Sequence, residues 1–313
     1  MTDKISLLAN LGTENIRVYE LDGYYDMFYG YVAPNTNVIY KFDLKLFQSG
    51  LILRYPSKEN TNEFPEYAED VKLAKIFKES EDWGDIMEVA HVGALNEHIV
   101  NNKIHDLILV NEALHEKKIA YIADEISENE DIRIVLIAGP SSSGKTTFAQ
   151  RLSIQLRVNG KKTYAISLDD YFVDREKTPR DENGNYDFDT IDSLDIELFN
   201  EHLLELMNGN QVQIPTFDFK TGKRIYDKEP VKLSKDHIIV VEGIHGLNDK
   251  LTSHINAKNK FKIYISALTQ LNIDNHNMIS TSDTRLIRRI VRDNQFRGHN
   301  AQSTMRMWES VRK

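Results

Sequence analysis

Four short apolar runs, rich in β-branched residues, recur through the second half of the chain and predict buried strands. They lie at residues 134–138, 163–172, 237–246 and 261–268. After the first run, and again over 195–208, the spacing of the apolar residues becomes helical. Strands that alternate with helices predict an α/β fold with a doubly wound, mostly parallel sheet.

The pattern in the first part of the chain differs and predicts a smaller α+β domain. Residues 1–56 alternate aromatic or β-branched residues with polar ones, which is typical of strands. A helical pattern follows from Glu66 to about Ser127 and ends at the acidic segment 127–131. We place a domain boundary there. The predicted domains are residues 1–126 and 132–313.

Aromatic residues gather in the first of these regions. Such rings can stack on bases, or they can fill the core of a small sheet. The alternation with polar residues favours the sheet core. These aromatic residues are Tyr24, Tyr25, Phe28, Tyr29 and Tyr31.

Directly after the run at 134–138 the chain reads GPSSSGKT (139–146), which is the Walker A pattern between a strand and a helix. Its glycines let successive backbone N–H groups turn inward and form an anion nest at a helix N-terminus. Lys145 can reach the β- and γ-phosphates, and the Thr146 hydroxyl can ligate Mg²⁺. A plain serine- and glycine-rich turn is the alternative, which this context disfavours. The predicted phosphate cradle comprises Gly139, Ser141, Ser142, Ser143, Gly144, Lys145, Thr146 and Thr147.

Two of the other apolar runs end in carboxylates. Asp169 and Asp170 follow the second run, and Glu242 ends the third. In an open α/β sheet, ligands bind beyond the carboxyl ends of the strands, so we expect these groups beside the phosphates. Glu242 would hold Mg²⁺ together with Thr146, and Asp169 would accept a proton from an attacking hydroxyl. A strand-end turn or a helix cap is the alternative for Asp169-Asp170.

Arginines cluster near the end of the chain. Arg285, Arg289 and Arg292 recur at helical spacing and share one face, with Arg288 beside them. Guanidinium groups pair with phosphate oxygens, so the cluster favours a clamp on a transferred phosphoryl group. A solvated helix face and contact with RNA are the alternatives.

Composition limits the class of protein. The 313 residues carry a net charge of −9, which disfavours a nonspecific binder of nucleic acid or of anionic membranes. Cysteine is absent, so disulfides and thiolate metal sites are excluded. We find no signal-peptide pattern and no apolar run of membrane-spanning length. A soluble, cytoplasmic protein is therefore expected, and a homo-oligomer stays open.

Together these patterns predict transfer of the γ-phosphoryl group of a nucleoside triphosphate, with Mg²⁺, to the hydroxyl of a small molecule, and they leave the choice of ATP over GTP open. Catalysis of that reaction is mostly positioning and charge neutralisation. Two alternatives stay open: hydrolysis that drives motion, and a noncatalytic, nucleotide-dependent RNA-binding or regulatory protein.

The motifs also carry a family resemblance. GPSSSGKTT, SLDDYF, PTFDF, VVEGI and DTRLIRRIVRD, in that order, resemble the uridine kinase and phosphoribulokinase group of P-loop kinases over residues 133 to about 312. The resemblance implies a nucleoside-like acceptor, Asp169 as general base, Glu242 as the acid near the metal, and a lid that carries arginines up to Arg297. The resemblance also implies that Asp189 binds the ribose hydroxyls of a nucleoside. The resulting catalytic candidates are Lys145, Asp169, Arg289 and Arg292, and the substrate-binding candidates are Asp189, Phe217, Asp218 and Arg285.

The sequence departs from the family in two places. Uridine kinases carry a Tyr-Asp-Phe motif followed by a His that contacts the base, whereas residues 217–222 read FDFKTG and put Gly222 at the position of that His. A pyrimidine would lose a hydrogen-bonding partner there, which leaves the acceptor open. Family members also continue past the lid with a strand and a helix, so we expect a chain that ends at Lys313 to be truncated and less active.

The whole arrangement is similar to a bacterial subgroup of uridine kinase-like proteins. In that subgroup the kinase follows a region similar to the second additional domain of threonyl-tRNA synthetase. Here DMFYGYVAPNT (26–36) is similar to the stretch of that domain that carries a metal-binding Cys and His. Phe28 and Val32 stand at those two positions, which implies that this metal site is absent.

Overall fold

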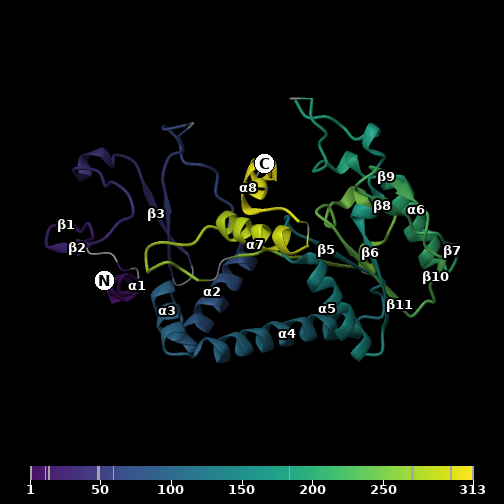
Figure 1. The fold of residues 1–313 in the computed structure, drawn as a ribbon, viewed down its shortest axis with the longest axis horizontal. Coiled ribbons are helices and arrows are strands. Elements are labelled where there is room, and N and C mark those ends of the chain that lie inside the picture. Colours follow the sequence, from purple (N-terminus) through teal and green to yellow (C-terminus); the bar gives the residue numbers. More distant parts are fainter. Residues whose placement is uncertain are drawn as a thin grey trace. The chain divides into compact units, whose positions relative to one another are not determined.

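A computed structural model describes residues 2–10, 12, 15–47, 50–58, 60–182, 184–268, 271–296 and 298–311 (Figure 1). The chain divides into two compact units. Unit 1 comprises Met1–Ile104 and Gln270–Met278, and unit 2 comprises His105–Thr269 and Ile279–Lys313. Within the part of the chain that the structure describes, no helix combines the length and the apolar character that a membrane span requires.

Unit 2 is built on a parallel sheet with the strand order β12-β5-β11-β6 (Figure 1). The register sets Glu242, the last residue of β11, opposite Ser167, the last residue of β6. All four strands run in the same direction, so their carboxyl ends meet at one edge. The predicted parallel α/β fold is confirmed. The strands are β5 (Ile134–Ala138), β6 (Lys162–Ser167), β11 (His237–Glu242) and β12 (Lys260–Tyr264).

Helices cover both faces of this sheet. Successive strand residues point to opposite faces, so β5 sends Ile134 and Leu136 to one core cluster and Val135 and Ile137 to another. The first cluster includes residues of α6 (Ile196–Met207), and the second includes residues of α4 (Ile104–Glu128) and α5 (Lys145–Val158). The strands are therefore buried on both sides, which explains why they read as continuous apolar runs.

The helix predicted over 195–208 is confirmed as α6, and its ends follow from the sequence. Asp195 caps the helix, because its side chain accepts a hydrogen bond from the Leu198 backbone N–H at 3.1 Å. Gly209 follows the helix with a φ of 79°, a left-handed conformation that glycine adopts without strain.

The remaining elements of unit 2 are two small antiparallel pairs and two helices. The pairs join β7 (Gln211–Val212) to β10 (Val231–Lys232) and β8 (Thr216–Asp218) to β9 (Lys223–Ile225). The helices are α7 (Thr281–Phe296) and α8 (Ala301–Val311).

Unit 1 contains helices and two separate hairpins. The helices are α1 (Thr2–Ala9), α2 (Val71–Ile86) and α3 (Val92–Val100). The hairpins are β1 (Tyr19–Leu21) with β2 (Tyr24–Asp26), and β3 (Asp43–Phe47) with β4 (Gly50–Arg54).

The prediction that the N-terminal aromatic residues fill a small sheet core is wrong. Their exposed fractions range from 41% for Phe28 to 92% for Tyr31. The physical reason is that a two-stranded hairpin is too small to enclose a core of its own. The buried residues of this region include Leu7 of α1 and Met27, which follows β2.

Residues 271–278, which precede α7 in the chain, belong to unit 1. The Asn272 carbonyl accepts a hydrogen bond from the Val92 N–H at 2.9 Å, and the Asn275 N–H donates to the Asp3 carboxylate at 2.9 Å. Asp274 is fully buried. Unit 1 is therefore assembled from two separate stretches of sequence.

The compact units divide the chain earlier than the acidic segment 127–131 does. Nearly all of α4 belongs to unit 2, because Ile119, Ala123 and Ile126 pack in the same core cluster as α5. The predicted boundary between the two domains at residues 127–131 stays a prediction.

Candidate functional site

The GPSSSGKT loop joins the end of β5 to the start of α5. Ser142 and Gly144 both have positive φ, at 63° and 102°, and this turns the backbone toward the N-terminus of α5. A Cβ atom on Gly139 would lie 2.0 Å from the Ile265 carbonyl oxygen, so no other residue fits there. Positive φ values of this kind are typical of loops that turn N–H groups toward an anion, which is the role predicted for this loop.

Lys145 extends back over this loop. Its Nζ donates to the carbonyls of Gly139 at 2.9 Å and Pro140 at 3.3 Å. Burial lowers the pKa of Lys145, and the charges of Glu242 and Asp169 partly oppose this shift. The charges of both predicted carboxylates therefore act on the predicted lysine.

The residues of the loop fit a phosphate group. The buried hydroxyls of Ser142 and Ser143 have no hydrogen-bond partner among the residues that the structure describes. Phosphate oxygens are acceptors that such hydroxyls, and the N–H groups at the start of α5, can donate to. Thr146 and Thr147, in the first turn of α5, are exposed.

Three side-chain oxygens meet where β6, β11 and α5 converge. Glu242 Oε1 accepts hydrogen bonds from Thr146 Oγ1 and Ser167 Oγ, each at 3.2 Å. Burial, followed by the neighbouring charge of Asp169, raises the pKa of Glu242. The described residues hold no group of three or more His, Asp or Glu side chains placed to bind a metal. One carboxylate with a hydroxyl suits Mg²⁺, which usually takes its other ligands from phosphate and water.

The two aspartates after β6 occupy different environments. Asp170 is committed to structure, because it accepts a hydrogen bond from the Phe217 N–H at 3.2 Å and pairs with Lys228 at 3.5 Å. Asp169 is exposed, and its charge raises the pKa values of both Lys145 and Glu242. Of the pair, Asp169 is the carboxylate whose charge acts on Lys145 and Glu242 of the predicted site.

The arginines of α7 contact the loop. Arg285 Nε donates to the Ser141 carbonyl at 3.2 Å, Arg288 Nε donates to the Ser142 carbonyl at 3.1 Å, and Arg289 donates to the Ser141 hydroxyl at 3.3 Å. This places three guanidinium groups at the predicted phosphate cradle.

The next arginine of the helix is held by its own neighbour. Arg292 pairs with the buried carboxylate of Asp293 at 2.8 Å. Arg297, the last of the predicted lid arginines, lies outside the described residues.

The predicted substrate-binding residues beyond the loop are only partly gathered. Burial and the charge of Asp187 raise the pKa of Asp189, and the charges of His245 and Arg289 oppose this shift. Phe217 is buried in an aromatic cluster. Asp218 closes a turn, because its carboxylate accepts from the Lys220 N–H at 2.9 Å and the Thr221 hydroxyl at 2.8 Å.

Two residues of the site were not predicted. Ser167 donates to Glu242, and His245 has a buried Nε2 with no hydrogen-bond partner in the described part of the chain. Both lie at or just beyond the carboxyl end of a strand, at the edge that already pointed to Asp169 and Glu242. Ligands bind beyond the carboxyl ends of the strands in an open α/β sheet, and this rule, applied to every polar residue at that edge, would have identified both residues.

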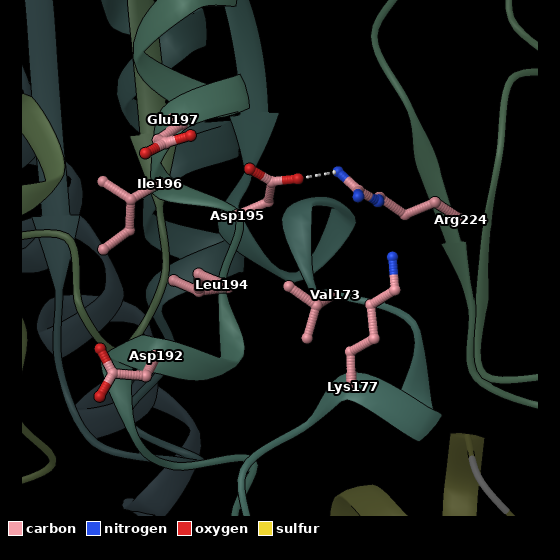
Figure 2. A pocket seen from close by; sticks show the side chains of 8 residues that line it. All are labelled: Val173, Lys177, Asp192, Leu194, Asp195, Ile196, Glu197 and Arg224. Atoms are coloured by element: carbon pink, nitrogen blue, oxygen red, sulfur yellow. Dashed lines mark ion pairs between the residues drawn. The ribbon is translucent and has the colours of Figure 1, made fainter.

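A pocket of about 390 Å³ is lined by residues of the segment 173–197 and by Arg224 (Figure 2). It is bordered by an ion pair of 2.8 Å between Asp195, the cap of α6, and Arg224 of β9. None of the predicted site residues lines it. The other lining residues are Val173, Lys177, Asp192, Leu194, Ile196 and Glu197.

Comparison with protein families identifies the family of the second part of this chain. The model of the Phosphoribulokinase / Uridine kinase family matches residues 134–313. A uridine kinase from Ureaplasma parvum serovar 3 is 30% identical over 178 residues, which cover 57% of this chain and 77% of that protein. Uridine-cytidine kinase B from Dictyostelium discoideum is 29% identical over 180 residues, which cover 58% of this chain and 66% of that protein.

Among solved structures, a possible uridine kinase from Bacillus stearothermophilus aligns with a TM-score of 0.35 and 28% identity. The alignment covers 42% of this chain and 70% of that one. The family match begins at residue 134, so the similarity of residues 26–36 to threonyl-tRNA synthetase stays a prediction.

Proposed function

Since the chain belongs to the Phosphoribulokinase / Uridine kinase family, we propose that it transfers the γ-phosphoryl group of ATP to a hydroxyl of a nucleoside or a related small molecule. One observation carries this proposal. Glu242 of β11 accepts hydrogen bonds from Thr146 of the phosphate loop and from Ser167 of β6, two residues before Asp169. This contact supports a nucleotide subsite that lies next to a base for the acceptor.

Each residue of the proposed site has its own role in the reaction. The loop N–H groups and Lys145 bind the phosphates of ATP and orient the γ-phosphoryl group. Asp169 takes the proton from the acceptor hydroxyl as its oxygen attacks phosphorus and the bond to the β-phosphate breaks. Arg289 and Arg292 stabilise the charge that spreads over the transferred group.

The metal that this reaction uses fits the same place. Thr146 and Glu242 would hold Mg²⁺, directly or through water, and the ion would neutralise charge on the phosphates. Asp189, Phe217 and Arg285 are proposed to border the acceptor. Asp218 is a weaker candidate, because its carboxylate already closes a turn.

Two substitutions test the assignment. Lys145→Ala is expected to abolish ATP binding, whereas Asp169→Asn keeps ATP binding and lowers kcat by about 10²- to 10⁴-fold. Calorimetry measures nucleotide affinity, and a coupled ADP assay with a panel of nucleosides and sugars measures turnover.

The control for both variants is Asp236→Asn. Asp236 is an exposed carboxylate just before β11, at the opposite end of the sheet, and it pairs with Lys162 at 3.0 Å. The control is expected to retain full activity. Wild-type turnover by Asp169→Asn would refute Asp169 as the base.

A further inference from the structure

The turn between β8 and β9 has an arginine packed against its glycine. Gly222 has a φ of +70°, and its N–H donates to the Asp218 carbonyl at 2.7 Å. A Cβ atom on Gly222 would lie 2.8 Å from both Cβ and Nε of Arg175 and 2.9 Å from its Cζ. The side chain of Arg175 therefore occupies the space that a side chain at position 222 would enter.

Arg175 is held there by backbone groups. Its own N–H donates to the Gly222 carbonyl at 2.8 Å, and its guanidinium donates to the Phe219 carbonyl at 2.5 Å. Across the described ranges, no Asp or Glu forms an ion pair with Arg175. Its charge is thus not neutralised by a partner, and only part of its donor capacity is used.

Aromatic contacts connect the turn that holds this guanidinium to the segment that carries Asp189. Phe172 packs against Phe188 with 6.1 Å between ring centroids, and against Phe219 with 6.3 Å. Phe188 is the neighbour of Asp189, and Phe219 supplies the carbonyl that Arg175 contacts. One aromatic cluster therefore links Arg175 to the loop that carries Asp189.

We propose that Arg175 is a specificity-determining residue of the acceptor site, and that it selects acceptors with a phosphate or carboxylate group at this point. The proposal rests on the phosphotransfer function above. A guanidinium has five donors and no acceptor, and it pairs with two adjacent oxygens. An anion satisfies it, whereas the uracil edge places an N–H donor between its two carbonyls and leaves that donor unpaired.

The experiment compares wild-type protein, Arg175→Gln and Arg175→Lys on three acceptors: uridine, ribose 5-phosphate and glycerate. Arg180→Gln is the matched control, because Arg180 is an exposed arginine of the same segment that donates to the Gly184 carbonyl at 2.6 Å and packs on Tyr186. Steady-state kinetics give kcat and KM, calorimetry gives acceptor affinity without turnover, and circular dichroism checks the fold.

We expect wild-type protein to prefer one of the two anionic acceptors. Arg175→Gln should raise the KM for that acceptor by about 10- to 100-fold, the loss of one charge-assisted contact, and leave its kcat nearly unchanged. Arg175→Lys should restore part of the affinity, and uridine should respond to neither variant. Ribose 5-phosphate carries a phosphate and glycerate carries a carboxylate, so comparison of the two acceptors shows which anionic group Arg175 recognises.

Other outcomes are equally decisive. If Arg175→Gln weakens all three acceptors by the same factor, Arg175 only supports the turn and the proposal is overturned. If no acceptor is phosphorylated but an anionic one binds in an Arg175-dependent manner, the transfer reaction fails and the role of Arg175 stands. Absence of any Arg175-dependent change in binding or KM refutes it.

Discussion

Glu242 shows at the scale of one residue how a site can cost stability. Its carboxylate is largely removed from water and lies near the charge of Asp169, so its pKa is raised. Two hydroxyl donors, Thr146 and Ser167, compensate only in part. Such a group is retained for what it binds and not for what it adds to folding.

The pH dependence of stability tests this view. Because the pKa of Glu242 is higher in the folded protein, the stability it contributes is present in acid and is lost as the pH rises through the folded pKa. Without nucleotide, Glu242→Gln should therefore melt at a higher temperature than wild type at pH 8, and the advantage should shrink toward pH 5.

The same variant should also lose the additional stabilisation that Mg²⁺ gives with ATP, because a neutral amide is a poorer ligand for this ion. Thermal melts between pH 5 and 8, with and without Mg²⁺ and ATP, measure both effects. Glu201→Gln, at an exposed position on α6, is the control. A Glu242→Gln advantage that grew in acid would contradict the argument.

Helix α7 shows at the scale of an element how arginines are kept in position. The buried carboxylate of Asp293 pairs with Arg292 at 2.8 Å and with Arg289 at 3.4 Å, and it accepts from the Thr304 hydroxyl of α8 at 3.3 Å. Asp293 thus fixes two of the predicted catalytic arginines and joins α7 to α8.

Removing this charge should loosen both helices. Asp293→Asn leaves two guanidinium groups without their carboxylate, and loss of one partner from a buried pair typically costs about 3–5 kcal/mol. We expect faster amide hydrogen exchange over residues 281–296 and 301–311 and a lower kcat. Asp283→Asn, at an exposed position in the first turn of α7, should change neither. Unchanged exchange in Asp293→Asn would refute the positioning role.

Elements with strong local signals were the ones that the sequence predicted. Strands β5 and β11 are buried on both faces, and their sequences are therefore continuous apolar runs that indicate a strand clearly. Asp195 and Gly209 indicate the two ends of α6. Arg175 could not be predicted in this way. Its contact with Phe219 joins residues 44 positions apart and depends on how a turn folds back.

The prediction that the N-terminal aromatic residues fill a sheet core was wrong for a related reason. Alternation indicates a strand, but whether a strand has a second layer to pack against depends on the rest of the unit. Among the strands of the described residues β1 pairs with β2 and no other, and Tyr24 and Tyr25 are exposed.

The discontinuity of unit 1 is a property of the whole molecule, and it can be tested through Asp274. This buried carboxylate accepts hydrogen bonds from the His276 N–H at 2.8 Å and the Asn277 N–H at 2.9 Å, so it folds the segment 271–278. Asp274→Ala should leave these donors unpaired, expose the segment to limited proteolysis, and lower the melting temperature of unit 1 more than that of unit 2.

Asn275→Ala is the matched control, because Asn275 is exposed and contacts Asp3 through its backbone N–H, which alanine retains. It should be cleaved at the wild-type rate. Equal resistance of Asp274→Ala and wild type to protease would show that residues 271–278 are held by other contacts.

The same discontinuity constrains how this chain can be altered by recombination. Residues 270–278 of unit 1 lie in the sequence between β12 and α7, inside the stretch that matches the kinase family. A crossover near residue 104 would therefore exchange most of unit 1 but retain this segment from the other parent. Asn272 and Asn275 would then have to find equivalents of Val92 and Asp3 in a foreign partner. Selection would favour inheritance of the two units together.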